Sequence, residues 1–365
     1  MKSSGIGGQA VLEGIMMRYK NDVAVAVRKT NGEIVVEKHK MTSPKDKHKW
    51  MGWPLIRGVV SFVSSLVVGI KTLMESAEYF EVDEEEEQEE SQETADKGSD
   101  KKKEEKSGKG EAAMMTGTLI VAVILAVAIF LLLPYYAAAG IMWLIGSDST
   151  TLLAIIEGIL KLAIFIGYIA AISFMEDIKR TFMYHGSEHK CINCIETGHE
   201  LTVDNVMAAS REHRRCGTSF IFFVLIISII FFIFLRFDNR LLRFVVRILL
   251  IPVIAGVSYE FIQWAGNTNS KIAAVLSKPG LWVQKLTTRE PTPDMVEVAI
   301  CSVEAVFDWR GYLRENGYEV SDPEPEAVPE GESEAGEAAA DITEDQDDAG
   351  GASAPSDPLC GGCTL

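Results

Sequence analysis

Long apolar runs constrain the fold of this 365-residue chain more than any other feature. A helix needs about 20 apolar residues to cross the hydrocarbon core of a bilayer, and four runs approach or exceed that length. They cover about 116–138, 151–175, 217–235 and 241–264. The first lies in an uncharged stretch, and we expect a disturbance near Pro134. The runs predict a membrane α-helical fold with about four transmembrane helices in a domain over 112–264.

A further apolar stretch precedes these four runs and is shorter. Within 51–80 only Gly58–Ile70 is free of charge, which is too short for an ordinary crossing. We therefore expect a re-entrant or interfacial helix there. Inside the second long run, Glu157 and Lys161 are spaced to pair on one helix face, which favours mutual neutralisation over an ion path.

The distribution of basic residues predicts the orientation. Residues 1–58 hold eleven Lys and Arg, the loop 176–216 holds six, and 146–150 holds none. Because positively charged loops stay in the cytoplasm, four crossings would place the N-terminal region, this loop and the C-terminal region on the cytoplasmic face. We predict a multi-pass protein of the cell membrane with cytoplasmic termini and the lipid bilayer as its surroundings.

Acidic residues account for the net charge of −17 and are concentrated outside the apolar runs. They cluster in 81–96 and 322–348, where blocks of like charge repel one another and bury nothing. We expect a disordered linker over 81–111 and a disordered tail over 318–365. This acidic balance argues against nucleic acid as a partner.

Two soluble segments show local structural signals. In the N-terminal region, 1–50, β-rich runs at 23–29 and 33–38 flank Asn31-Gly32, a strong hairpin signal. In the C-terminal region, 265–317, Asp294 can cap a helix with apolar residues at helical spacing. We expect a small cytoplasmic β-hairpin and an amphipathic helix that packs on cytoplasmic partners.

The chemistry of the chain is concentrated in an H-x-x-E-H motif. His185 and His189 would lie four residues apart on one helix face and could hold one zinc ion, with Glu188 beside them as general base. A catalytic site needs a third ligand and an open position. The candidates for that ligand are His213, Cys216 and Glu260, all expected at the cytoplasmic face.

Two other readings of these residues remain open. Cys191, Cys194, His213 and Cys216 have the ligand types and paired spacing of a closed structural zinc site. Alternatively, the histidines are ordinary polar residues near the membrane and the cysteines are small reduced hydrophobes. Gly186 inside the motif also disfavours a helix by about 1 kcal/mol relative to Ala.

Six motifs in order resemble the YqhQ-like family of bacterial membrane proteins over about residues 5–310. They are GGQAVLEGIMMR at 7–18, WPLIRGVV at 53–60, YHGSEHKCIN at 184–193, RCGTSF at 215–220, AGVSYEFI at 255–262 and LWVQKLTTREP at 281–291. The family is designated a predicted metal-dependent enzyme family, and its pattern includes His185, Glu188, His189, Cys216 and Glu260. We therefore expect zinc to be held by His185 and His189 with Glu260 or His213 as the third ligand. The family usually has His-Pro-Arg-Cys-Gly where this chain has His213-Arg-Arg-Cys-Gly, which puts the local turn in doubt.

The resemblance also implies a substrate site. Glu13, Arg18, Arg57 and Arg289 belong to the family pattern and could line one cleft with the histidines, where arginines suit a carboxylate or phosphate. We therefore expect a zinc-dependent hydrolase at the cytoplasmic membrane face, its substrate unspecified. The alternative is a non-enzymatic assembly or transport-accessory factor. Cys194 and Cys216 could then be structural thiols, and a homo-oligomer or a protein partner is possible in either case.

Overall fold

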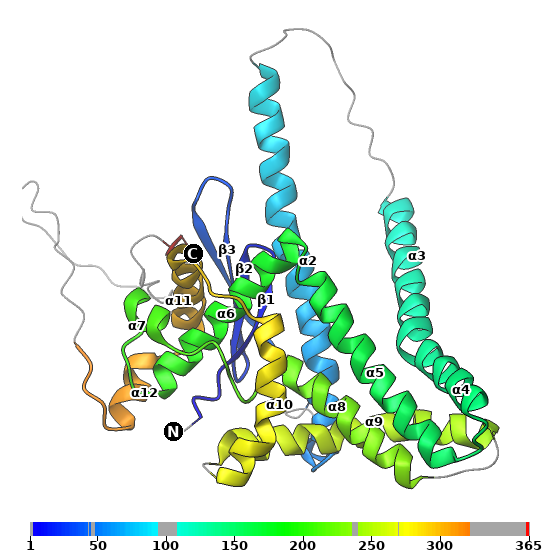
Figure 1. The fold of residues 1–365 in the computed structure, drawn as a ribbon. Coiled ribbons are helices and arrows are strands. Elements are labelled where there is room, and N and C mark those ends of the chain that lie inside the picture. Colours follow the sequence, from blue (N-terminus) through cyan, green and yellow to red (C-terminus); the bar gives the residue numbers. More distant parts are fainter. Residues whose placement is uncertain are drawn as a thin grey trace, which may run out of the picture.

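The fold is seen in a computed structural model that describes residues 3–42, 44, 48–93, 108–235, 240–268, 270–321 and 363–364. Most of the predicted acidic tail and the middle of the predicted acidic linker lie outside these residues. Figure 1 shows a small sheet with several helices beside it, and long helices extending away from this domain.

A four-stranded antiparallel sheet begins the chain. Its strands, in spatial order, are β1 (Gly7–Val11), β2 (Gly14–Tyr19), β3 (Asp22–Arg28) and β4 (Ile34–Lys40), and the two-residue β5 (Cys363–Thr364) adds in parallel to β4. The predicted hairpin is confirmed as β3 and β4, paired from Arg28 with Ile34. Gly32 in its loop has a φ of 89°, a conformation that favours glycine.

Four helices cover this sheet or extend its core. They are α6 (Glu176–Glu196), α7 (Val203–Ala208), α11 (Pro293–Val306) and α12 (Trp309–Glu315). The amphipathic helix predicted with Asp294 as its cap is confirmed as α11, but the N-cap is Thr292 and Asp294 lies in the first turn. However, its apolar residues Val298 and Cys301 are buried in the protein's own core with β2 and α6 residues, rather than facing an external partner. Segments from both ends of the chain and from its middle thus share one core.

The long apolar helices confirm the expectation of a multi-pass membrane protein. The remaining helical elements are η1 (Lys49–Gly52), α2 (Ile56–Glu93), α3 (Gly108–Val127), the π-helical η2 (Ala128–Leu132), α4 (Leu133–Ile145), α5 (Thr150–Ile172), α8 (Gly217–Phe234), α9 (Arg240–Asn267) and α10 (Lys271–Thr287). Among the described residues, five stretches are long and apolar enough to cross a membrane: Ile56–Tyr79, Ile120–Ile145, Thr150–Ile172, Gly217–Phe234 and Val245–Asn267. The π-helical turn directly precedes Pro134, where a disturbance was predicted.

Helix α2 differs from the sequence prediction. Counting only charge-free residues gave a short element, whereas α2 is one continuous helix whose Ile56–Tyr79 part is a fifth candidate span. It also continues to Glu93, into the segment predicted as a disordered linker. Glu is a good helix former, so an acidic run can extend a helix that has already been nucleated.

Several charged residues within the candidate spans are paired. The predicted pair is confirmed, since Lys161 Nζ lies 2.7 Å from a Glu157 carboxylate oxygen. A third member was not predicted: Arg247 of α9 donates two hydrogen bonds to the same carboxylate, at 3.0 and 2.9 Å. Similarly, Arg57 at the start of α2 donates two hydrogen bonds to Glu260 of α9. Each pair satisfies charges that would be costly to leave alone in a bilayer.

Candidate metal centre

Helix α6 carries the H-x-x-E-H motif on a side that is buried in the domain. Glu188 and His189 are buried there. The glycine inside the motif has a structural reason: a Cβ on Gly186 would lie 2.1 Å from the backbone oxygen of Arg289. The segment after α10 therefore passes too close for any other residue, and this packing outweighs the low helix propensity of glycine.

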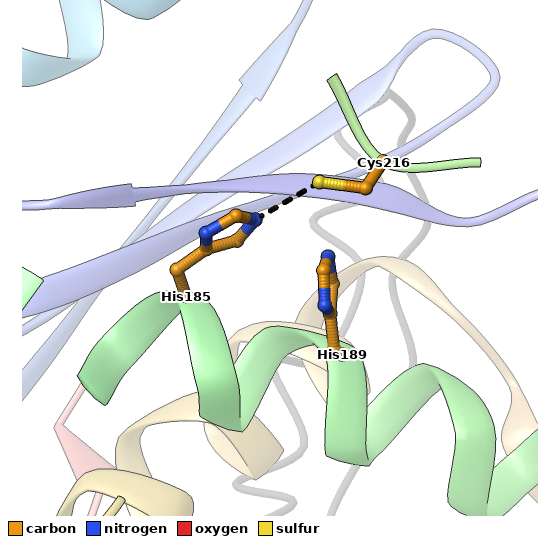
Figure 2. A group of neighbouring side chains, drawn as sticks. All are labelled: His185, His189 and Cys216. Carbon is orange, nitrogen blue, oxygen red and sulfur yellow. Dashed lines mark hydrogen bonds between the residues drawn. The ribbon is translucent and has the colours of Figure 1, made fainter. Parts of the chain in front are cut away.

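Cys216 completes a group of three possible metal ligands with the two histidines. One ligand atom from each of His185, His189 and Cys216 lies within 4.8 Å of the others. In Figure 2 both imidazoles project from α6 toward the sulfur of Cys216, and the Sγ atom lies 3.3 Å from Nε2 of His185. Cys216 is the N-cap of α8, so this helix sets the position of the sulfur.

Backbone carbonyls fix the orientation of both imidazoles. Nδ1 of His185 lies 2.8 Å from the oxygen of Thr287, and Nδ1 of His189 lies 2.6 Å from the oxygen of Arg211. A carbonyl can only accept, so both Nδ1 atoms carry the hydrogen and donate it. In a neutral imidazole this leaves the Nε2 lone pair available on the side of Cys216. Metal-binding histidines are characteristically held in this way.

The electrostatics of the group also suit a cation. Burial acts to raise the pKa of Cys216, but His185 and His189 hold it well below its usual value. Burial acts to lower the pKa of His185, but the Cys216 thiolate raises it to about 9. Cys216 and His185 thus form a thiolate–imidazolium pair that shares one proton. A metal ion could replace that proton.

Glu188 lies one turn of α6 from His185, and strand β1 covers it. The backbone N–H of Gly8 donates to its Oε1 at 3.1 Å, and a Cβ on Gly8 would lie 3.1 Å from its carboxyl carbon. Burial raises the pKa of Glu188, while the nearby His185 and His189 act to lower it. A carboxyl group with a raised pKa and one oxygen held by a backbone N–H can serve as a general acid or base.

The other two proposed third ligands are engaged elsewhere. The backbone of His213 is held by Gln284, and its Nε2 lies 3.8 Å from a Glu196 oxygen. Its ring lies near that of His189, with centroids 5.6 Å apart, but His213 does not belong to the three-ligand group. Glu260 accepts two hydrogen bonds from Arg57 and one from the Leu55 N–H, because the start of α2 packs against α9. The structure therefore brings Cys216, rather than these two residues, to the histidines.

The four residues of the closed zinc site are not brought together. Cys191 and Cys194 belong to the apolar core beneath the sheet, and burial raises the pKa of both thiols, that of Cys194 to about 12. The Cys194 thiol donates toward the backbone oxygen of Glu200 at 3.3 Å. Only Cys216 of the described cysteines has ligand atoms of histidines beside it. On α6, Cys191 and Cys194 lie on a different side of the helix from His185 and His189.

The residues predicted to line one substrate cleft are spread over several contacts. Glu13 pairs with Arg180 of α6, and Arg18 donates to the backbone oxygen of Lys20. Arg57 pairs with Glu260 in the membrane-spanning part. Of the four, Arg289 is the one whose backbone lies against the motif helix, where its N–H donates to the oxygen of Phe182.

Two further residues of α6 hold the segment that shapes the centre. Lys190 donates to the backbone oxygens of Met207 and Ala209, and Asn193 donates to those of Ser210 and Glu212. These bonds hold the segment that presents the Arg211 carbonyl to His189. Lys190 and Asn193 lie within YHGSEHKCIN, so the motif pointed to them, but not to what they hold.

A second group, Glu37, His39 and Glu75, also has ligand atoms within 4.8 Å of one another. It joins the edge of β4 to helix α2. His39 is already bonded to Glu75, and Glu37 is about half exposed. We interpret this group as a polar contact between sheet and helix.

The fold and this centre define a multi-pass membrane protein with a small α/β domain that holds a cluster of potential metal ligands. Residues 53–309 match the family described as "Protein of unknown function (DUF1385)". The chain is also 35% identical over 295 residues to "Uncharacterized protein YqhQ" of Bacillus subtilis (strain 168), covering 80% of this chain and 89% of that protein. The chain belongs to the DUF1385 family. Its identity to YqhQ confirms the YqhQ-like resemblance expected from the six motifs.

No solved structure matches the chain. The names of this family and of this relative state no activity and no metal. The metal-dependent enzyme implied by the resemblance therefore remains a proposal.

Proposed function

We propose that this protein is a metal-dependent enzyme, with zinc held by His185, His189 and Cys216. The observation that carries the proposal is the orientation of both imidazoles: each Nδ1 donates to a backbone carbonyl, and the Nε2 side meets the sulfur of Cys216. Two imidazoles and one thiolate are a ligand set found in catalytic zinc sites, which keep one position open.

Each residue then has a role in a hydrolytic reaction. A zinc ion held there would supply Lewis-acid polarisation of a carbonyl or phosphoryl substrate. Glu188 takes a proton from the attacking water and returns it to the leaving group, because burial keeps its pKa raised and the Gly8 N–H holds one carboxylate oxygen. Thr287 and Arg211 orient the ligands through their carbonyls. Strand β1 excludes water from one side of Glu188.

A specific observation supports a second candidate. Cys216 caps the N-terminus of α8, accepts a hydrogen bond from the Thr218 N–H, and lies 3.3 Å from the His185 Nε2. A thiolate beside an imidazole at a helix N-terminus is the arrangement of a cysteine nucleophile. In that case Cys216 would attack the substrate directly and no metal would be needed.

Metal analysis of the detergent-purified protein tests the first candidate. We expect about one zinc per chain in the wild type, and loss of that zinc in His185→Ala, His189→Ala and Cys216→Ser. Cys194→Ser is the matched control, because this thiol lies in the apolar core and its loss should leave the zinc in place. Glu188→Gln should keep zinc and lose function in a cell that depends on the protein.

The same variants separate the alternatives. If chelation speeds alkylation of Cys216, its sulfur was held by a metal. If Cys216 is alkylated rapidly without chelation and the protein contains no zinc, the nucleophile candidate is favoured. A protein that lacks zinc and tolerates both Cys216→Ser and Glu188→Gln would instead support the non-enzymatic membrane factor.

The number of crossings is the second part of the proposal, and it follows from which segments share a core. The sheet and α6 pack together, and the Gly8 N–H contacts Glu188. They must lie on the same side of the membrane, because an open sheet edge does not occur in hydrocarbon. Three candidate spans separate them, in α2, α3 with α4, and α5. An even number of these spans must cross, so one of them does not.

We infer that α2 is the candidate span that does not cross, because it ends on the same side of the membrane as the sheet. Val68 packs in the core of the sheet, and Glu75 contacts His39 of β4. Within the candidate span Ile56–Tyr79, only 56–67 lies beyond the contacts with the sheet. This is about 18 Å of helix, which is short of a hydrocarbon core of about 30 Å. The tip reaches α9 near its middle, where a Cβ on Gly256 would meet the Leu55 backbone oxygen at 2.7 Å. We propose four crossings and a re-entrant α2, with the shared domain and both termini cytoplasmic.

A further inference from the structure

Helix α10 has the reverse of the pattern expected in water. Its buried face is formed mainly by small or polar residues at helical spacing: Ala273, Ser277, Gly280, Gln284 and Thr287, with Val283 as a large apolar exception. The exposed face is formed by large apolar residues: Ile272, Val275, Leu276 and Trp282, with Ile272 67% and Trp282 55% exposed. A helix in water buries its apolar stripe, so the outer face of α10 requires an apolar neighbour.

The buried face resembles the contacts between helices inside membranes. A Cβ on Gly280 would lie 2.9 Å from both Ser219 Oγ and a ring carbon of Phe223, and Gln284 donates to Ser219 at 2.7 Å. Close packing through small residues and side-chain hydrogen bonds is typical of membrane helices. Since α10 packs in this way on α8, a candidate span, its exposed face continues the apolar surface of the spans.

Three lysines follow one edge of that exposed face. Lys271, Lys278 and Lys285 are seven residues apart, which places them in one row along the helix, and all three are exposed. An apolar face bordered by lysines is typical of helices that lie in the plane of the membrane interface, where the ammonium groups reach anionic headgroups. Moreover, α10 is not among the candidate spans, so it need not cross.

We propose that α10 lies in the interface of one leaflet, with Ile272, Val275, Leu276 and Trp282 among the acyl chains and the lysine row at anionic headgroups. The bilayer is the occupant because the exposed face is continuous with the spans and because the lysines match anionic lipid. The sequence had placed this segment in a cytoplasmic region.

Together with the proposed function, this position indicates the class of substrate, and only this inference about the substrate rests on the proposed function. The Thr287 carbonyl at the end of α10 orients His185, and Gln284 holds the backbone of His213. The candidate centre therefore sits at the level of the headgroups. A substrate that reaches it from the leaflet would be a membrane amphiphile whose reacting group lies at the interface.

Quenching of Trp282 fluorescence by brominated lipid tests the position of α10 and needs no metal. The full-length protein and Trp282→Phe are placed in vesicles of phosphatidylcholine and phosphatidylglycerol, with and without bromine on the acyl chains. The difference between the two emission spectra reports Trp282, and we expect bromine to remove most of it. Trp309→Phe is the matched control: Trp309 is 4% exposed in the domain core, and its contribution should not change.

Two results would overturn the proposal. If Trp282 is quenched no more than Trp309, the face is outside the lipid. If its emission is unquenched but blue-shifted, a protein surface covers it, either a second copy or another chain. If the centre contains no metal but Trp282 is quenched, the proposed function fails while the position of α10 stands.

The lysine row is tested with bromine on only one lipid. Brominated phosphatidylglycerol should quench Trp282 more strongly than brominated phosphatidylcholine at equal content. Lys278→Gln and Lys285→Gln should each reduce that preference about fivefold, equivalent to ~1 kcal/mol per lysine. A preference that survives both changes would overturn the assignment of the lysines to anionic headgroups.

Discussion

Two buried polar clusters in this protein are built on opposite principles. In the cluster of Glu157, Lys161 and Arg247, the carboxylate accepts from both cations, and the charges are satisfied by one another. In the cluster of His185, His189 and Cys216, backbone carbonyls orient the imidazoles and their electron-pair donors converge within 4.8 Å. The carboxylate of the first cluster is fully paired within the chain, whereas the second cluster attracts a cation.

The difference shows how a structural cluster can be told from a functional one. Burial makes an unpaired charge costly, so a charge network that is complete within the chain is explained by folding alone. Converging donors repel each other unless a proton or a metal lies between them. The comparison predicts that changes in the first cluster affect stability and changes in the second affect ligand binding.

The largest expected effect is on stability, from Glu157→Gln. This change leaves the partly buried cations Lys161 and Arg247 beside a buried amide without a carboxylate, and should lower the free energy of unfolding by about 3–5 kcal/mol. Denaturant unfolding in detergent micelles would measure it. Replacing all three residues with Leu or Met should recover most of the loss. A Glu157→Gln protein as stable as the wild type would show that the cluster is not structural.

The next effect is on metal affinity, from Asn193→Leu. The Asn193 amide donates to the backbone oxygens of Ser210 and Glu212, on either side of the Arg211 carbonyl that orients His189. Loss of such a supporting contact should weaken zinc binding about 10–100-fold. Competition with a zinc-binding dye measures the affinity. Asn205→Ala is the control, because this amide donates to Glu200 instead. Equal affinities in both variants would contradict the proposed support.

The smallest effect is a pH dependence of the same affinity. Burial acts to lower the pKa of His185, but Cys216 raises it to about 9, so the metal-free centre holds a proton on His185 at neutral pH. Zinc needs the neutral imidazole and must displace that proton. Its apparent affinity should therefore fall about tenfold for each pH unit below that pKa. Calorimetry in buffers of different ionisation enthalpy counts the released proton, and affinity that does not change with pH would contradict the shared proton.

The sequence predicted features that depend on short-range spacing. The i,i+4 positions of His185 and His189, the hairpin around Gly32 and the pairing of Glu157 with Lys161 follow from periodicity and turn chemistry, and the structure contains all three. The apolar runs likewise predicted the candidate spans at 151–175, 217–235 and 241–264 closely.

Features that depend on packing between distant segments were not predictable. Cys216 was one of three possible third ligands, and only the position of α8 against α6 distinguishes it from Glu260, which α2 engages through Arg57. Arg247 had no local signal for its partner. The strands β1 and β2 were not predicted, because GGQAVLEGIMMR contains three glycines and its apolar and polar residues alternate only weakly.

X-ray absorption at the zinc edge tests the central claim most directly. The purified protein with one bound zinc should show nitrogen neighbours at about 2.0–2.1 Å and one sulfur at about 2.3 Å. The sulfur signal should be lost in Cys216→Ser and retained in Cys194→Ser. A zinc ion without a sulfur neighbour in the wild type, or with sulfur that persists in Cys216→Ser, would contradict the centre of His185, His189 and Cys216.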